Sequence, residues 1–425
     1  MQSENNVYYN ISSIPGLLNL LDEENAEICE TKILNKTISY TKRNQKYFVI
    51  RYDKNILSND LISTYGLTRS IILNSNNKIV SFAPPKSINA EEFITCYPNL
   101  NSPGMVVEEF VEGTMINVFW DETVGLTGSW EIATRNVVGA ESSFYKTFDS
   151  ESCFKSKTFR DMFLEAASEN NLIIDVLDKR FCYSFVLQHP ENRIVVPFNR
   201  PQLYLVAVYE IIYFNEKTIY VSHLDMNFVK NNGSWHTTSI QFPKIYNNTS
   251  YSELIDTYAS MNTPYNILGV VIKNVLTGQR CKIRNPNYEQ VRLLRGNQPK
   301  LQYQYLCLRK EGKVGDFLKY YPEEKKMFSS FRDQLHLFTR TLYQNYISCY
   351  IKKEKPLLEF PKEYRSHMYQ IHQKYLNELR EKKLHVTNTV VINYVNSMQP
   401  AHILYWLNHN VRQRHIDLLN ADTNF

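Results

Sequence analysis

The spacing of apolar residues changes once along this chain, and that change most constrains the fold. From Ile33 to Ile283 short β-branched runs alternate with turns rich in Asn, Gly and Pro, as in "YFVIRYD", "KIVSFA" and "LYLVAVYEIIY". This pattern is typical of twisted antiparallel sheets. The stretch "SKTFRDMFLEAASENN", from Ser156 to Asn171, interrupts it with apolar residues at helical spacing. The sequence therefore predicts an α+β domain.

After Gly296 the apolar residues recur every three or four positions, as on one face of a helix. A long helix is predicted to begin near Pro322. Its apolar stripe comprises Phe328, Phe331, Leu335, Phe338, Leu342, Tyr346 and Ile347. We therefore predict two domains, an α+β domain over residues 1–296 and an all-α domain over residues 297–425.

Composition excludes several classes of protein. None of the 425 residues falls in an apolar run long enough for a membrane span, and "MQSENNVYYNISS" does not resemble a signal peptide, so a cytoplasmic protein without membrane contact is expected. The seven cysteines contain no CxxC pair, which argues against a zinc site or a disulfide framework. With 13 glycines and neither GxGxxG nor GxxxxGK[ST], Rossmann and P-loop folds are disfavoured.

Positive charge is concentrated in the predicted helical domain. From Gly296 to Phe425 there are 20 Lys and Arg against 12 Asp and Glu, a net +8 in a chain of net +5. Such a surface can meet the phosphates of a nucleic acid, or it can simply be a solvated helical face. The many aromatic residues of this domain favour a helical core over a base-stacking platform. His367 and His372 are expected at the surface.

Several strings resemble, in order, those of the RNA ligases of the bacteriophage tRNA-repair type, which are covalent nucleotidyltransferases. They are "GLTRSIILNSNNKIVSFAPPKSIN", "VVEEFVEGTMINVF", "GSWEIATRNVVGA", "YSFVLQHPENRIVVPFNRPQLYLVAVYE", "NILGVVIKN" and "RCKIRNPNY". The resemblance covers Tyr47 to Tyr288 and is most specific from His189 to Glu210. It implies a ligase-like nucleotidyltransferase fold for residues 1–296.

The resemblance also assigns phosphate-contacting residues. In that family an arginine and a lysine on early strings and a pair of cations on a late strand contact nucleotide phosphates. The matching residues here are Arg69, Lys86, Lys282 and Arg284. The resemblance therefore implies that this chain retains a phosphate- or nucleic-acid-binding set. Exposed loop charges, or the solvent-facing edge of a strand, would explain the same four residues.

The catalytic positions of the family differ in this chain. When Gly113 is placed on the glycine of the family's "EKxDGS" string, Phe110 falls on the nucleophilic lysine and Glu112 on the aspartate. Val186, or its neighbour Leu187, and Leu268 stand where the family has carboxylates. Phenylalanine has no lone pair to attack phosphorus, and a metal would lack ligands. The comparison predicts no catalytic residue, no metal site and no cofactor; taken alone, these residues are ordinary strand-core residues.

Two functions follow. The first is a catalytically inactive RNA-ligase-like protein that binds RNA or a protein partner. The second is an active ATP-dependent RNA ligase, which would use ATP and Mg²⁺ and form its enzyme–AMP intermediate on a displaced lysine, with Lys86, Lys273 and Lys282 as candidates. If the first holds, Phe110, Val186 and Leu268 should lie close together between two sheets and leave little room for a nucleotide.

Overall fold

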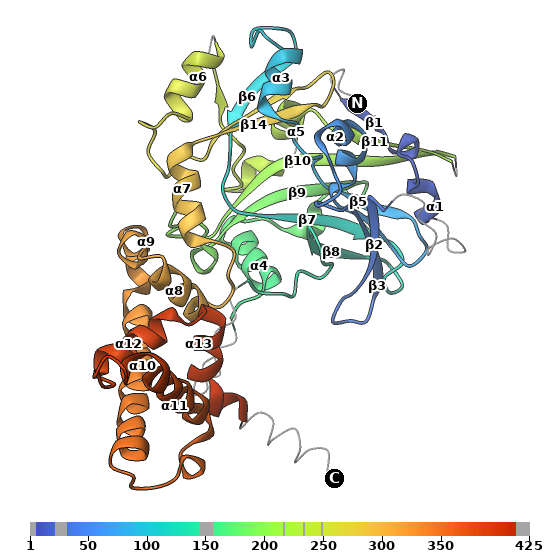
Figure 1. Cartoon of the computed structure of the whole chain (residues 1–425). Coiled ribbons are helices and arrows are strands. Elements are labelled where there is room, and N and C mark those ends of the chain that lie inside the picture. The colour runs from blue at the N-terminus through green and yellow to red at the C-terminus, as the bar shows by residue number, and fades with distance from the viewer. Residues whose placement is uncertain are drawn as a thin grey trace. The chain divides into compact units, whose positions relative to one another are not determined.

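A computed structural model describes residues 6–21, 32–144, 156–215, 217–232, 234–247 and 250–413 (Figure 1). Residues 1–5 of the predicted first domain and 414–425 of the predicted second lie outside the described residues. The chain divides into two compact units, Met1–Arg292 and Leu293–Phe425. This division falls within helix α7 (Pro286–Arg295). The two units are described separately below.

The first unit contains three antiparallel sheets among its described residues. The six-stranded sheet has the order β1 (Val7–Asn10), β11 (Thr218–His223), β10 (Gln202–Asn215), β9 (Phe181–Gln188), β7 (Thr114–Asp121), β8 (Ser129–Thr134). The second is β12 (Ile245–Tyr246), β6 (Met105–Glu109), β13 (Gly269–Asn274), β14 (Arg280–Arg284), and the third is β2 (Leu34–Tyr40), β3 (Lys46–Tyr52), β4 (Ile71–Leu73), β5 (Ile79–Phe82).

Alternation of side chains gives the six-stranded sheet two apolar faces. One face is covered by α4 (Phe159–Glu169), with Phe163 packed on Phe185 of β9. The opposite face packs on the β2–β5 sheet, where Phe82 contacts Tyr209 edge to face. Thr158 begins α4 with a capping box completed by Asp161, as suits the predicted helix from Ser156.

Shorter helices complete the first unit. They are α1 (Leu17–Leu21), α2 (Ile62–Tyr65), α3 (Ala90–Cys96), α5 (Met226–Asn232) and α6 (Tyr251–Tyr258). Phe93 of α3 and Leu254 of α6 lie in one apolar core with Val270 and Ile272 of β13. That core covers one face of the β6–β13–β14 strands, so the other face is the one left to build a site.

The second unit is helical throughout its described secondary structure. Its helices are α8 (Leu301–Lys310), α9 (Val314–Tyr320), α10 (Lys325–Tyr346), α11 (Lys362–Lys374), α12 (Asn388–Ser397) and α13 (Pro400–Leu407). The predicted stripe of α10 is buried from Phe328 to Tyr346, whereas Ile347 is half-buried. The prediction of antiparallel sheets followed by a helical C-terminal region is thus confirmed.

Helices α10 and α11 run in parallel. Phe338 stacks on Tyr364, and Tyr346 contacts His372, so both contacts advance in the same direction along the chain. His367 of α11 is buried and its Nδ1 lies 2.8 Å from the Tyr394 hydroxyl. The expectation of a surface position was wrong for His367, because α11 turns this residue toward Phe338 and Trp406. No helix among the described residues is both long and apolar enough to cross a bilayer.

Candidate functional site

The chain passes from one sheet to another between Glu109, the last residue of β6, and Thr114, the first of β7. Gly113 makes this crossing possible. Its φ is +147°, and a Cβ at this position would lie 2.4 Å from the carbonyl oxygen of Leu187 and 2.7 Å from Cγ1 of Val186. Only glycine tolerates that conformation and that close approach. The crossing therefore holds Phe110 beside the sheet of β6 and brings Gly113 against β9.

The strand register gathers cations on one face. Residues directly opposite each other in an antiparallel pair share a face. In the strand register Lys282 pairs with Val271, and Arg280 pairs with Lys273. Val271 also pairs with Glu108 of β6. Because side chains alternate along a strand, Arg280, Lys282 and Arg284 all share this face with Lys273 and Glu108.

This face lies opposite the six-stranded sheet. Tyr209, His223, Lys273 and Arg280 line one cavity between the two sheets, and Tyr9 lines it as well. Its volume is about 30 Å³, which suits one or a few waters rather than a nucleotide. Little space is thus left in this cavity between Lys273 and Arg280 and the six-stranded sheet.

Phe110 lies against the cations. The ammonium of Lys282 is 4.2 Å from the centroid of the Phe110 ring, and the guanidinium carbon of Arg284 is 5.8 Å from it. A cation over an aromatic face is attracted by the negative potential of the ring, by about 0.5–1 kcal/mol when exposed and more when desolvated. Phe110 stands at the position predicted for the nucleophile. It therefore contacts Lys282 and Arg284, two of the residues that the sequence predicts to bind phosphate.

Lys282 has an unusual environment. Burial is the main cause that lowers its pKa, to about 6, and the charges of Arg280, Arg69 and Arg284 lower it further. Among the described residues no carboxylate pairs with Lys282. Lys273, by contrast, forms an ion pair with Glu108 at 2.5 Å. Lys282 is thus largely neutral at pH 7 unless an anion approaches it.

Arg69 belongs to the same group of charges. Burial lowers its pKa to about 10, and the repulsion from Arg280 adds to the effect. Lys86 also has a lowered pKa, caused first by burial and then by Arg135. The structure thus brings together Arg69, Lys282 and Arg284, while Lys86 is linked electrostatically to Arg135.

Sequence reasoning missed two members of this group. Arg280 precedes Lys282 at strand spacing in "RCKIR", so the alternation itself was a usable signal; its guanidinium donates to the carbonyl of Pro85. Arg135 donates to the carbonyl of Arg69 at 3.3 Å and lies over the Tyr52 ring. No local pattern indicates Arg135, because its contacts come from distant strands. We call Arg69, Arg135, Arg280, Lys282 and Arg284 the cation group.

Val186 and Leu268 are both buried. Val186 lies on β9 opposite Met115 and against Gly113. The carbonyl of Leu268 accepts the N–H of Asn285 at 2.9 Å. Gly269, which follows Leu268, would face Phe110 if the β6–β13 register continued by one residue. Burial agrees with apolar replacements at carboxylate positions, and the convergence of the three side chains stays a prediction.

Glu112 has a structural role in the crossing. Its carboxylate accepts the backbone N–H groups of Val195 at 2.7 Å and Val196 at 3.1 Å. Asn192 reinforces the contact by donating to the Thr114 hydroxyl at 2.8 Å. Burial raises the pKa of Glu112 to about 7, although these hydrogen bonds oppose the rise. The string "HPENRIVV", which begins the most specific part of the resemblance, is therefore hydrogen-bonded to Glu112, the residue that matches the family's aspartate.

Two carboxylates near the crossing, Glu108 and Glu112, are already engaged in contacts. Within the described ranges, no group of three or more His, Cys, Asp or Glu side chains could hold a metal ion. Glu108 is engaged by Lys273, and Glu112 is engaged by backbone amides. What the arrangement offers chemically is positive charge partly removed from water, the environment that binds phosphate strongly.

Comparison with known proteins supports the resemblance. The chain is 28% identical over 106 residues to an RNA ligase of Rhodothermus phage RM378, a stretch covering 24% of this chain and 23% of that ligase. The alignment thus spans less than a quarter of that relative's length. It is 25% identical over 342 residues to the immediate-early protein ICP-46 homolog of Invertebrate iridescent virus 6, covering 77% of this chain and 70% of that protein. No family model matches the chain.

Solved structures of RNA ligases also resemble it at low identity. A Naegleria gruberi RNA ligase mutant is 13% identical with a TM-score of 0.33, over 49% of this chain and 57% of that one. An archaeal ATP-dependent RNA ligase is 10% identical with a TM-score of 0.35, over 70% and 67% of the two chains. The phage sequence match relates part of this chain to an RNA ligase.

Proposed function

We propose that this RNA-ligase-like protein binds RNA through phosphates and does not transfer adenylate. One observation carries the proposal: Lys282, without a carboxylate partner among the described residues, lies against the Phe110 ring at the position predicted for the nucleophile. The cations that would contact phosphate are present and grouped. The group that would attack phosphorus is replaced by a ring.

The electrostatics of the cation group favour an anionic ligand. Burial is the main cause that lowers the pKa values of Lys282 and Arg69, and repulsion between the neighbouring like charges lowers them further. A phosphate bound beside them would replace repulsion by charge-assisted hydrogen bonds. RNA supplies phosphates at regular spacing, and a cation group on a strand face can follow its backbone. RNA is therefore the partner that best fits the group.

Absence of adenylyl transfer is supported by the same geometry. Phe110 cannot act as a nucleophile. Glu108 is occupied by an ion pair with Lys273. Two requirements of the reaction, a nucleophile and a free carboxylate for the metal, are thus opposed by contacts of named residues.

The test combines RNA binding with ATP labelling on the full chain. We expect RNA to be retained in a filter-binding titration, about tenfold more weakly by the Arg69→Gln, Lys282→Met double variant. Lys78→Met, which changes an exposed lysine paired with Glu122, should bind as the unchanged protein does. No covalent AMP should form with radiolabelled ATP and Mg²⁺. Absent or salt-insensitive RNA binding would overturn the proposal and favour a protein partner.

A second candidate function is an active ATP-dependent RNA ligase in which Lys282 is the displaced nucleophile. The observation that favours it is the pKa of Lys282, lowered to about 6 by burial and neighbouring cations, since an attacking amine must be unprotonated. Lys273 is held by Glu108 and is a weaker candidate, and Lys86 has a lowered pKa of its own. A protein–AMP band that disappears in Lys282→Met would establish this function.

A further inference from the structure

Strand β2 forms one edge of the third sheet. In the described part of the chain it pairs with β3 alone. With seven residues it is longer than the other strands at the edges of the described sheets, which are β1, β5, β8, β12 and β14. An edge strand presents backbone N–H and C=O groups for pairing, and many proteins shorten it or interrupt it with proline. β2 contains no proline, so its edge is suited to pairing with another strand.

The register shows which backbone groups of β2 point away from β3. Thr41 donates its N–H to the carbonyl of Gln45 at 3.1 Å, and Asp53 donates to the carbonyl of Ile33 at 2.7 Å. Both pairs continue the register that joins β2 to β3. Hydrogen-bonded and non-hydrogen-bonded pairs alternate along two antiparallel strands. The odd-numbered residues of β2 therefore bond to β3, and the even-numbered residues direct their N–H and C=O groups outward. These outward residues are Leu34, Lys36, Ile38 and Tyr40.

Two of the outward residues also expose apolar side chains. Ile38 and Tyr40 are each 57% accessible. Because side chains alternate between the two faces of a strand, these two share one face of β2. Phe48, which pairs with Ile38 in the register, lies on the same face. A strand added to β2 would place its own side chains against Ile38 and Tyr40, as cross-strand neighbours do. The edge therefore offers apolar contact together with hydrogen bonds.

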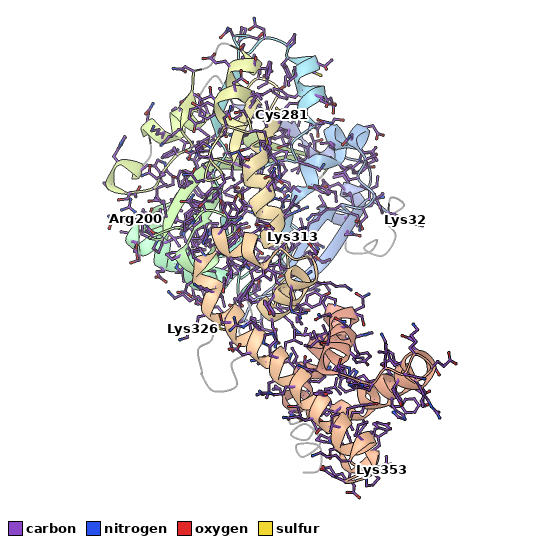
Figure 2. All side chains as sticks on the ribbon, turned by 60° about the vertical axis from the view of Figure 1, so that its left-hand side comes forward. Lys32, Arg200, Cys281, Lys313, Lys326 and Lys353 are labelled. Atoms are coloured by element: carbon purple, nitrogen blue, oxygen red, sulfur yellow. The ribbon has the colours of Figure 1, made fainter. Side chains whose placement is uncertain are left out.

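The hairpin of β2 and β3 is strongly basic on this side. From residue 32 to residue 48 the sequence has five Lys and Arg and no Asp or Glu. Figure 2 shows Lys32, the first of these cations, at the margin of the first unit. The ammonium groups of Lys36 and Lys46 lie 4.4 Å and 4.7 Å from the centroid of the Phe48 ring. Two like charges thus gather at one ring beside the edge, where a carboxylate would be attracted by both.

This charge indicates which occupant the edge can accept. A second copy of the chain would bring the same cations to the edge, and like charges across a strand pair are unfavourable. Nucleic acid supplies phosphates, but it lacks the alternating N–H and C=O groups that pair with a strand. An extended peptide with carboxylates supplies both the pairing groups and the opposite charge. Lys42, in the turn of this hairpin, already attracts one carboxylate, that of Glu141 at 3.7 Å.

We propose that β2 binds an acidic, extended segment of a partner protein by strand addition. The backbone of the segment pairs with Lys36, Ile38 and Tyr40, and its carboxylates lie beside Lys36 and Lys46. In this mode of recognition main-chain hydrogen bonds provide affinity and the alternating side chains provide specificity. The surface uses no residue of the cation group, so it can be tested apart from the proposed function.

The experiment measures binding of a labelled peptide to the full chain by fluorescence anisotropy. The peptide is as long as β2, and threonine and valine alternate in it between a glutamate at each end. We expect it to bind, and to bind more weakly as salt rises. The same peptide methylated on every backbone nitrogen keeps its charge but cannot donate to a strand, so it should bind about tenfold more weakly or less. Equal binding of the two peptides, or binding of neither, would overturn the inference.

Ile38→Pro tests the edge from the side of the protein. Proline removes the outward N–H of Ile38 and leaves the hydrogen bonds between β2 and β3 in place, so the melting temperature should change little. We expect the affinity for the peptide to fall about tenfold. Tyr40→Ser should also weaken binding, because it removes an apolar contact. Tyr8→Ser is the matched control, since Tyr8 is an exposed tyrosine of the edge strand β1, 52% accessible, and it should leave the affinity unchanged.

A charge variant and a measurement of mass complete the test. Lys46→Gln should weaken peptide binding and reduce its salt dependence, whereas Lys78→Met, which precedes β5 of the same sheet, should not. Unaltered affinity in both Ile38→Pro and Lys46→Gln would overturn the inference. Loss of RNA binding rather than peptide binding in Lys46→Gln would assign these cations to RNA and would also overturn it. Sedimentation should show no dimer; a dimer that Ile38→Pro dissociates would assign the edge to a second copy instead.

Discussion

The ammonium of Lys282 lies 4.2 Å from the centre of the Phe110 ring. Two positions that the resemblance singles out meet in this contact. Lys282 on β14 is a residue predicted to contact phosphate, and Phe110 stands at the position predicted for the nucleophile. The Phe110 ring partly shields the ammonium from water and stabilises its charged form.

Replacing Lys282 by methionine should stabilise the protein at low pH. The pKa of Lys282 is about 6 in the fold, compared with 10.5 for an ordinary lysine. Between those values the unfolded chain binds more protons at this residue, so stability rises with pH. The unfavourable contribution of Lys282 is therefore largest below pH 6 and fades toward pH 10.

Urea denaturation of both proteins at pH 6 and pH 9 measures this effect. We expect Lys282→Met to exceed the unchanged protein at pH 6 by about 1–3 kcal/mol in the free energy of unfolding, and by less at pH 9. Lys78→Met, at an exposed lysine, provides the control and should show no such trend. An equal difference at both pH values would contradict the pKa of Lys282.

The stability of the protein should depend on the side-chain oxygens of Glu112 more than on its charge. Its carboxylate accepts N–H groups from Val195 and Val196, and Glu112→Ala leaves both buried donors without partners. We expect a loss of about 2–4 kcal/mol in the free energy of unfolding. Glu112→Gln keeps an acceptor and should lose far less.

The pH dependence at Glu112 has the opposite sign to that at Lys282. The pKa of Glu112 is about 7 in the folded protein, compared with 4.5 for an ordinary glutamate. The folded chain then holds more protons between those values, so stability falls as pH rises from 4.5 to 7. Glu112→Gln should remove this fall, which thermal melting at pH 5 and pH 8 would measure. A fall that persists in Glu112→Gln would show that another group causes it.

Gly113→Ala should destabilise the fold strongly. A Cβ would lie 2.4 Å from the Leu187 carbonyl oxygen, a rigid backbone atom. Gly125→Ala is the matched control, since Gly125 also has a positive φ of +66° but no atom within 4 Å of its Cβ position. We expect a loss of about 3 kcal/mol or more at Gly113 and about 1 kcal/mol at Gly125. Similar melting temperatures for the two variants would mean that the crossing is not tightly packed.

Much of the fold could be predicted because apolar spacing directly reflects strand and helix. The strands from Tyr47 onward and the buried stripe of α10 follow from that spacing alone. Phe110 was singled out through the resemblance to the family's "EKxDGS" string, in which its position is fixed by the nearby Gly113. Arg135 and the role of Glu112 could not be predicted, because they depend on which strands and loops meet in space. His367 was misplaced for the same reason: its surroundings come from α10, α12 and α13.

RNA binding should take up a proton at Lys282. The free ammonium has a pKa of about 6, lowered by burial and by Arg280, Arg69 and Arg284. A bound phosphate would favour the charged form and raise that pKa. Affinity for RNA should therefore fall as pH rises from 6 to 8, by up to about fiftyfold for one proton of this kind. Lys273 is already paired with Glu108.

Lys282→Arg separates this effect from general electrostatics. Arginine stays protonated throughout this range, so the variant should bind RNA with nearly equal affinity at pH 6 and pH 8. Filter binding at constant ionic strength measures both proteins, and histidines common to the two cancel in the comparison. Because His223 is buried and its pKa is lowered to about 3, it stays neutral in both. If the unchanged protein and Lys282→Arg show the same pH dependence, Lys282 does not contact the phosphate, and the cation group would need another assignment.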